Sequence, residues 1–133
     1  MNKAILLFLV LLVMGCTSKE PDVGLEVPFV TQGCSGISES SSEVRVTTEG
    51  LSIVSSILTD KPCYTLKKAE ISRKGDDVTL YFTFDSDLAN CNACLGVENL
   101  IYSISGEGLN KTGINIELVA YFSGNETRMK FTS

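Results

Sequence analysis

The stretch VTLYFTF, residues 78–84, alternates between apolar positions and positions held by threonine or tyrosine. Because neighbouring side chains of a strand point to opposite faces of a sheet, its valine, leucine and two phenylalanines share one apolar face. Residues 114–122, INIELVAYF, repeat this pattern over a similar length. We predict that both segments are strands near the middle of their sheets.

Six further segments show a weaker form of the same pattern, and turn residues separate them. They are residues 26–31, 44–48, 51–58, 64–72, 100–105 and 127–131. In 64–72 the apolar positions shift across Lys67-Lys68, which predicts a bulge in a strand at a sheet edge. Pro28 has no backbone N–H to donate, so the first strand is also predicted at an edge.

Eight short strands, each apolar on one face, are typical of two sheets packed face to face. We therefore predict an all-β fold, an antiparallel β-sandwich of about seven or eight strands that forms one domain over residues 25–133. The serine-rich segment SGISESSSE, residues 35–43, is interpreted as a loop or tether stretch and not as a second domain.

The N-terminus has the pattern of an export signal. Lys3 precedes an apolar run over residues 4–14, which is too short to cross a bilayer as a helix. Val13-Met14-Gly15-Cys16 resembles the lipobox of prokaryotic lipoproteins. The resemblance implies a signal peptide over residues 1–15, lipidation of Cys16, and a tether over residues 16–24 that holds the domain on the extracytoplasmic side of the cell membrane or envelope. The alternative is an ordinary signal peptide cut nearby, with Cys16 left free.

Charge and composition exclude several classes of function. Residues 1–15 contain one lysine and no acid, so the 11 basic and 16 acidic residues of the chain become 10 and 16, a net charge of −6. This acidic balance without a basic cluster argues against nucleic acid as a partner and against direct adsorption to anionic lipid. The chain has no histidine, which removes Ser-His-Asp and Cys-His catalysis and histidine metal sites. We therefore expect no catalytic residue, no metal and no cofactor.

Four cysteines remain once Cys16 is assigned to lipid: Cys34, Cys63, Cys91 and Cys94. An even number in an exported chain predicts two disulfides, and the sequence leaves their three connectivities open. The C-x-x-C spacing of Cys91 and Cys94 also occurs in redox-active dithiols. Such a site needs a helix after the motif, and the sequence predicts none there. A four-cysteine zinc site usually has two such pairs, whereas this chain has one.

Several residues together carry a second resemblance. Pro62-Cys63-Tyr64 opens a strand, Cys94 follows some 30 residues later, Tyr102 lies in the next strand, and Gly108 to Gly113 precede a closing strand. This pattern is similar to small immunoglobulin-like domains of prokaryotic lipoproteins. The resemblance implies a sandwich with a Cys63–Cys94 bridge, which leaves Cys34 to pair with Cys91. It implies no catalytic residue.

Two weaker site signals occur in predicted turns. Asn110-Lys111-Thr112 and Asn125-Glu126-Thr127 fit the N-glycosylation sequon, so Asn110 and Asn125 are its candidate acceptors. Oxygen-bearing side chains also gather at Asp85, Ser86, Asp87, Asn90 and Asn92, but their spacing matches no EF-hand loop and these residue types are ordinary in turns.

The sequence thus favours a non-enzymatic binding or interaction module, held at the membrane by lipid on Cys16 and presenting loops or a sheet edge to a protein partner. Two alternatives remain: a thiol-disulfide redox protein that uses Cys91 and Cys94, and a passive structural lipoprotein of the envelope. The segments 88–99 and 106–113 are the predicted contact loops, because loops on a rigid sandwich usually carry binding.

Overall fold

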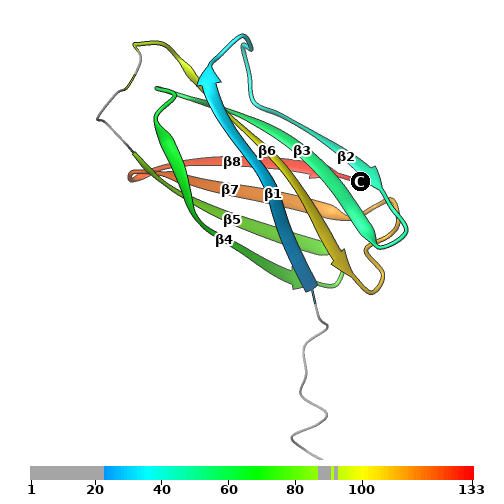
Figure 1. Cartoon of the computed structure of the whole chain (residues 1–133). Coiled ribbons are helices and arrows are strands. Elements are labelled where there is room, and N and C mark those ends of the chain that lie inside the picture. Colours follow the sequence, from blue (N-terminus) through cyan, green and yellow to red (C-terminus); the bar gives the residue numbers. More distant parts are fainter. Residues whose placement is uncertain (1–22, 87–90, 92) are drawn as a thin grey trace, which may run out of the picture.

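The computed structural model describes residues 23–86, 91 and 93–133, and these residues form eight strands (Figure 1). The strands are β1 (Val23–Cys34), β2 (Ser41–Val46), β3 (Gly50–Thr59), β4 (Tyr64–Lys74), β5 (Asp77–Ser86), β6 (Gly96–Gly106), β7 (Asn115–Phe122) and β8 (Asn125–Thr132). Each of the eight predicted strands is present, and β1 begins at Val23, inside the segment that was predicted as tether. Over the described residues, no helix is long and apolar enough to cross a membrane.

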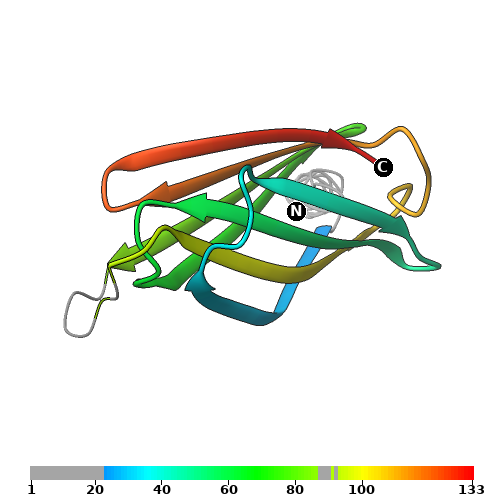
Figure 2. The same cartoon turned by 90° about the horizontal axis from the view of Figure 1, so that it is seen from above.

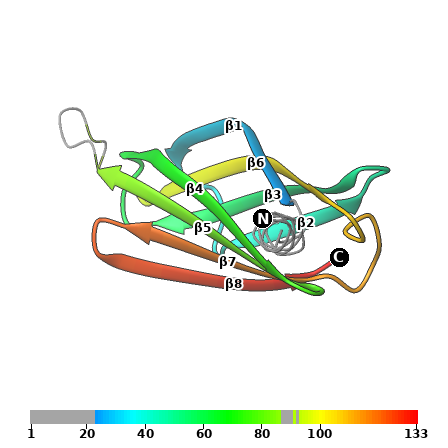
Figure 3. The ribbon, with the colours of Figure 1, turned by 90° about the horizontal axis from the view of Figure 1, so that it is seen from below.

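The strands form two sheets of four that face each other across the core (Figure 2). Sheet A has the order β1-β6-β3-β2, and sheet B has the order β4-β5-β7-β8. Figure 3 shows the same two layers from the opposite side. The two segments predicted near the middle of their sheets, β5 and β7, are the inner strands of sheet B.

The prediction of a wholly antiparallel sandwich is wrong at one place. Strands β5 and β7 pair in parallel, with Val78 opposite Ile116 and Phe84 opposite Phe122. The reason is the path of the chain between them: it leaves sheet B, runs back through β6 in sheet A, and returns beside β5. Parallel neighbours require such a crossover, and here a strand of the other sheet supplies it.

The strand order also limits the resemblance to immunoglobulin domains. In the constant-type immunoglobulin domain, the first, second, fifth and fourth strands form one sheet, and the third, sixth and seventh form the other. Sheets A and B have different orders from these. The likeness therefore extends to the two-sheet architecture and not to the order of the strands.

Both predictions about edge strands are confirmed. Strand β1 lies at the edge of sheet A, and its register with β6 shifts between Glu26 and Phe29, on either side of Pro28. Strand β4 lies at the edge of sheet B, and its register with β5 shifts between Leu66 and Lys68. Irregular edges of this kind oppose the addition of further strands from other chains.

The predicted turns also form. The β4–β5 hairpin closes through Gly75, whose φ is +63°, and the β7–β8 hairpin closes through Ser123 and Gly124, whose φ angles are +47° and +94°. Two central residues with positive φ define a type I′ turn, which matches the twist of the strands on either side.

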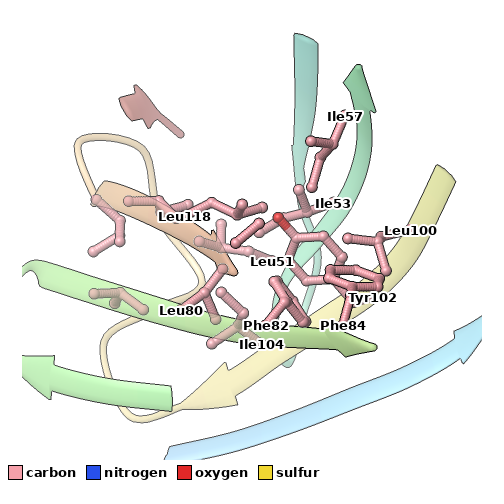
Figure 4. Close-up of a cluster of buried hydrophobic side chains, with 14 of the residues drawn as sticks. Leu51, Ile53, Ile57, Leu80, Phe82, Phe84, Leu100, Tyr102, Ile104 and Leu118 are labelled. Atoms are coloured by element: carbon pink, nitrogen blue, oxygen red, sulfur yellow. The ribbon is translucent and has the colours of Figure 1, made fainter. Parts of the chain in front are cut away.

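The inward faces of the two sheets meet in one apolar core (Figure 4). Aromatic rings link the layers, because Phe82 of β5 packs edge-on against Tyr102 of β6 with ring centroids 5.3 Å apart. The hydroxyl of Tyr102 bonds to Ser55 Oγ at 2.9 Å, and Ser55 Oγ bonds in turn to Ser42 Oγ at 2.7 Å. The buried phenol is thus connected through two serines to the edge strand β2.

Candidate functional site

Two disulfides lie at the end of the sandwich opposite to Val23, and their pairing corrects the one implied by the immunoglobulin resemblance. Cys34 pairs with Cys94, and Cys63 pairs with Cys91, at Cα–Cα distances of 5.7 and 5.5 Å. Strand register explains the pairing: Cys34 lies opposite Gly96 in the β1–β6 ladder, two residues from Cys94. Cys63 directly precedes β4, whose first residue pairs with the last residue of β5, and Cys91 follows β5.

The two cysteines of the C-x-x-C motif therefore belong to different bridges. Cys94 joins its segment to sheet A through β1, and Cys91 joins the same segment to sheet B at the start of β4. A redox-active C-x-x-C pair closes a bridge between its own two cysteines, which is not the arrangement here. Two bridges in one small domain suggest an oxidising, extracytoplasmic setting.

A crevice of about 290 Å³ opens beside these bridges, between the edge strands β1 and β4. Its lining includes Val30 and Gln32 from β1, Tyr64, Thr65 and Leu66 from β4, and Glu98 from β6. Val30 and Gln32 occupy inward-facing positions of β1 that remain exposed to solvent. The crevice thus leads from solvent into the space between the two sheets.

Glu98 is the unusual residue of this crevice. It is 0% exposed, and neither Oε1 nor Oε2 has a hydrogen-bond partner among the described residues. Burial favours the neutral form of a carboxyl group, and it raises the pKa of Glu98 from its usual 4.5 to about 8. Most buried polar groups are hydrogen-bonded, so this carboxyl calls for an explanation.

Sequence reasoning missed Glu98, because it placed this residue in a loop that ended at Asn99. Strand β6 begins earlier, at Gly96, and its inward positions are Glu98, Leu100, Tyr102 and Ile104. Extending the alternation of the predicted strand backwards by one step would have placed Glu98 on its apolar face. An acid on the apolar face of a strand was thus the available signal.

A second feature is the outer face of sheet A, where an apolar row crosses three strands. Phe29 of β1 lies opposite Ile101 of β6, and Ile101 lies opposite Val54 of β3. Their exposed fractions are 61%, 41% and 43%. A hollow of about 500 Å³ adjoins the row at Val54, lined also by Glu43, Val44, Arg45 and Ser52 of β2 and β3.

The two central strands carry no charge on this outer face. Their outward positions beside the row are Ser103 and Asn99 of β6 and Ser52 and Ser56 of β3. Ser56 Oγ donates to Asn99 Oδ1 at 2.7 Å, so these polar groups partly satisfy each other. The charges of this face lie on the edge strands: Glu26 on β1, and Glu43 and Arg45 on β2. The face therefore has an apolar centre, small polar neighbours and a charged rim.

The outer face of sheet B is different, because it carries several ion pairs. The Arg128 guanidinium contacts Glu117 at 2.6 Å and also contacts Glu126. Lys68 pairs with Glu70 at 2.8 Å. This is the ordinary surface of a sheet with one solvated face.

The other predicted site residues have no common location. Asn110 is exposed in the β6–β7 connection, and Asn125 is exposed at the start of β8 at the opposite end of the sandwich. Cys16, the predicted signal peptide, the tether up to residue 22, and residues 87, 90 and 92 of the oxygen-rich loop lie outside the described residues. Among the residues that the structure does describe, no group of three or more Cys, Asp or Glu is arranged to hold a metal ion.

Comparison of the chain with protein-family models, with curated proteins and with solved structures finds no match.

Proposed function

We propose that this chain is a lipid-anchored, extracytoplasmic binding module without enzymatic activity, and that it holds a protein partner on the outer face of sheet A. The observation that carries the proposal is the row Phe29, Ile101 and Val54, exposed on a face where the outward positions of the two central strands carry no charge. Protein interfaces have this composition: their centres are depleted of charge and enriched in apolar and aromatic side chains, and their rims are polar.

The chemistry of the partner follows from the same face. Three apolar side chains in a line, with serines and an asparagine beside them, favour a partner surface that is itself apolar and weakly charged. The hollow next to Val54 offers space for one inserted side chain. Because the rim carries Glu26, Glu43 and Arg45, mixed charges around the partner's apolar patch would fix its orientation.

The anchor in this proposal is Cys16, seven residues before β1 begins. A short polar segment separates the two, so the sandwich would stand close to the membrane surface with its sheet faces open to the side. Two or more acyl chains give durable attachment where one chain does not. The expected localisation is the extracytoplasmic side of the cell membrane or envelope.

Site-specific crosslinking tests the contact face. A photoreactive amino acid at Ile101 is compared with the same amino acid at Thr83, an outward position on the central strand β5 of sheet B. In intact cells, we expect an adduct with another protein from position 101 and none from position 83. Adducts from both positions, or from neither, would contradict the proposed face. An adduct of twice the mass of the chain would show that the partner on this face is a second copy of the same chain.

A separate measurement tests the anchor. The intact mass of the chain purified from membranes should equal that of residues 16–133 plus acyl chains, with all four other cysteines oxidised. Cys16→Ser should release the chain from the membrane fraction. A chain that stays soluble in its wild-type form would contradict the anchor while leaving the contact face open to the crosslinking test. If the sandwich is deleted, the lipidated segment is kept, and the cell shows no loss of function, a passive role in the envelope is favoured over a binding module.

A further inference from the structure

Glu98 is used neither by the fold nor by the proposed contact face. Its position, between Gln32 of β1 and Ile57 of β3 in the sheet register, is one that an apolar residue would fill more stably. Leu100, Tyr102 and Ile104, which follow it on the same face, are all buried and apolar or aromatic. An acid kept there without a partner in the described structure points to a ligand that supplies the missing partner.

Both walls of the crevice around Glu98 lie next to a disulfide, which restrains them. Gln32 lies two residues before Cys34, whose bridge ends at Cys94, four residues before Glu98. Tyr64 directly follows Cys63, which is bridged to Cys91. Gly96 allows the start of β6 to approach the β3–β4 turn closely, because a Cβ there would collide with the carbonyl oxygen of Lys61 and with Thr59 Oγ1. A site whose walls are fixed before binding loses little entropy when its ligand enters.

The lining selects the chemistry of the ligand. Val30, Leu66 and Tyr64 contribute apolar side chains to the lining, and Glu98 contributes the acidic group, which is buried. An anion is disfavoured, because the Glu98 carboxyl offers it at most one O–H donor and repels it when ionised. A metal ion needs several oxygen or other strong ligands, and Glu98 is the single acid among the lining residues. A guanidinium has five N–H donors to satisfy, whereas an ammonium has three.

We infer that this crevice binds a primary alkylammonium group, with the ammonium against the Glu98 carboxylate and the alkyl stem along Val30, Leu66 and Tyr64. The ligand is either a free alkylamine or the lysine side chain of a partner. This site is distinct from the outer face of sheet A, and it stands whether or not the proposed contact face is correct.

Binding at this site changes the protonation of Glu98. In the free protein at pH 7 the carboxyl is mostly neutral, since burial raises its pKa to about 8. An ammonium beside it favours the charged form, so the carboxyl releases its proton to solvent and the ammonium N–H groups donate to the carboxylate. The other titratable group in the lining is Tyr64, whose hydroxyl donates to Asp60 Oδ1 at 2.6 Å, and Lys61 Nζ lies 5.6 Å from the centre of the Tyr64 ring.

Calorimetry on the full chain, purified in detergent with both bridges oxidised, tests the inference. Butylammonium is titrated at pH 7 in two buffers that differ in ionisation enthalpy, with butanol as the uncharged control. We expect saturable binding of butylammonium with release of about one proton per ligand, a release that falls away above about pH 9. Butanol should bind more weakly and release none.

Two variants that each replace one glutamate by glutamine separate the site from general attraction to an acidic protein. Glu98→Gln should weaken butylammonium binding by about tenfold or more and abolish proton release. Glu107→Gln, at an exposed position, should leave both unchanged. The absence of saturable binding, equal binding by Glu98→Gln and the wild type, or binding without proton release would each overturn the inference. A circular dichroism spectrum that matches the wild type confirms that Glu98→Gln is folded.

A peptide distinguishes the two sources of the ammonium. A short capped peptide with one lysine is compared with the same peptide carrying norleucine, which keeps the stem and lacks the ammonium. If the lysine peptide binds and the norleucine peptide does not, the crevice is assigned to a partner's lysine. Binding of butylammonium and of neither peptide would assign it to a free alkylamine.

Discussion

The outer faces of the two sheets differ although the same chain and the same alternating pattern build both. On sheet B, charged side chains from β7, β8 and β4 form ion pairs, as between Arg128 and Glu117. On sheet A, the two central strands expose Ile101 and Val54 among serines and an asparagine, and no charge lies between the edge strands.

This difference shows that contact with solvent alone does not explain why the outer face of sheet A carries exposed apolar side chains. Both faces point away from the core, and an outward position in a solvated sheet is usually polar. A row of exposed apolar side chains in matching register on three strands is a feature of contact surfaces. On the inner faces the two sheets differ in the opposite sense. Sheet A buries an acid, Glu98, while the inward positions of β5 and β7 in sheet B carry apolar side chains.

The largest expected losses of stability come from opening the two disulfides. One joins the 91–94 segment to β1 of sheet A, and the other joins it to the start of β4 in sheet B. Replacing Cys34 and Cys94 by serine opens a bridge that spans 60 residues, and replacing Cys63 and Cys91 opens one that spans 28. The chain-entropy relation predicts losses of about 4 and about 3.5 kcal/mol in the free energy of unfolding. Urea denaturation of the two double variants measures them. A loss near zero for either would show that its bridge does not constrain the unfolded chain.

The next effect concerns the buried acid of sheet A. Because Glu98 has a raised pKa in the folded state, the unfolded chain ionises first as pH rises from 4.5 to about 8, and stability must fall over this window. We expect the fall that is due to Glu98 to be about 3.5 kcal/mol between pH 5 and pH 8. The free energy of unfolding, followed from pH 5 to about pH 8 in the wild type and in Glu98→Gln, isolates this contribution. Equal slopes in the two proteins would contradict the buried, unpaired state of Glu98.

A charge placed on each outer face sharpens the comparison directly. Ile101→Asp and Thr83→Asp introduce the same carboxylate on central strands of sheets A and B. We expect Ile101→Asp to weaken partner binding by about tenfold or more, since a charge at the centre of an interface loses its water on binding. Thr83→Asp should leave binding unchanged. The amount of partner that co-purifies with each variant from membranes gives the result, and equal loss in both would remove the distinction between the faces.

The smallest effect is expected from the ion pairs of sheet B. Arg128→Met removes contacts with Glu117 and Glu126, but all three side chains are at least partly exposed to solvent. Water and salt weaken such pairs, so the thermal midpoint should fall only slightly, and the difference from the wild type should vanish at high salt. A large fall that persists in high salt would mean that these pairs hold sheet B together.

Much of the fold could be predicted from local pattern. Alternation located all eight strands, and the chemistry of Pro28 and the slip at Lys67-Lys68 placed β1 and β4 at sheet edges. The parallel β5–β7 pair could not be predicted, because alternation determines which side chains share a face and not which strand lies beside which. Strand neighbours depend on contacts between segments far apart in the sequence.

The candidate sites follow the same division. If the alternation of the predicted strand is extended backwards by two residues, Glu98 falls on the inward face. Only the tertiary structure shows that its carboxyl has no hydrogen-bond partner among the described residues. No local pattern in the sequence marks Phe29, Val54 and Ile101 as a patch. They form a row only because β6 lies between β1 and β3.

The sequence by itself determined the strand content, the turns, the edge positions, the number of bridged cysteines, and the expectation of an exported, anchored chain. These properties depend on side-chain chemistry and on the two-residue period of an extended backbone. The tertiary structure decided which cysteines pair, which strands run in parallel, where an acid is buried, and which face is free of charge. Each of these requires two or more segments to meet in space, and that meeting is fixed by the packing of the whole core.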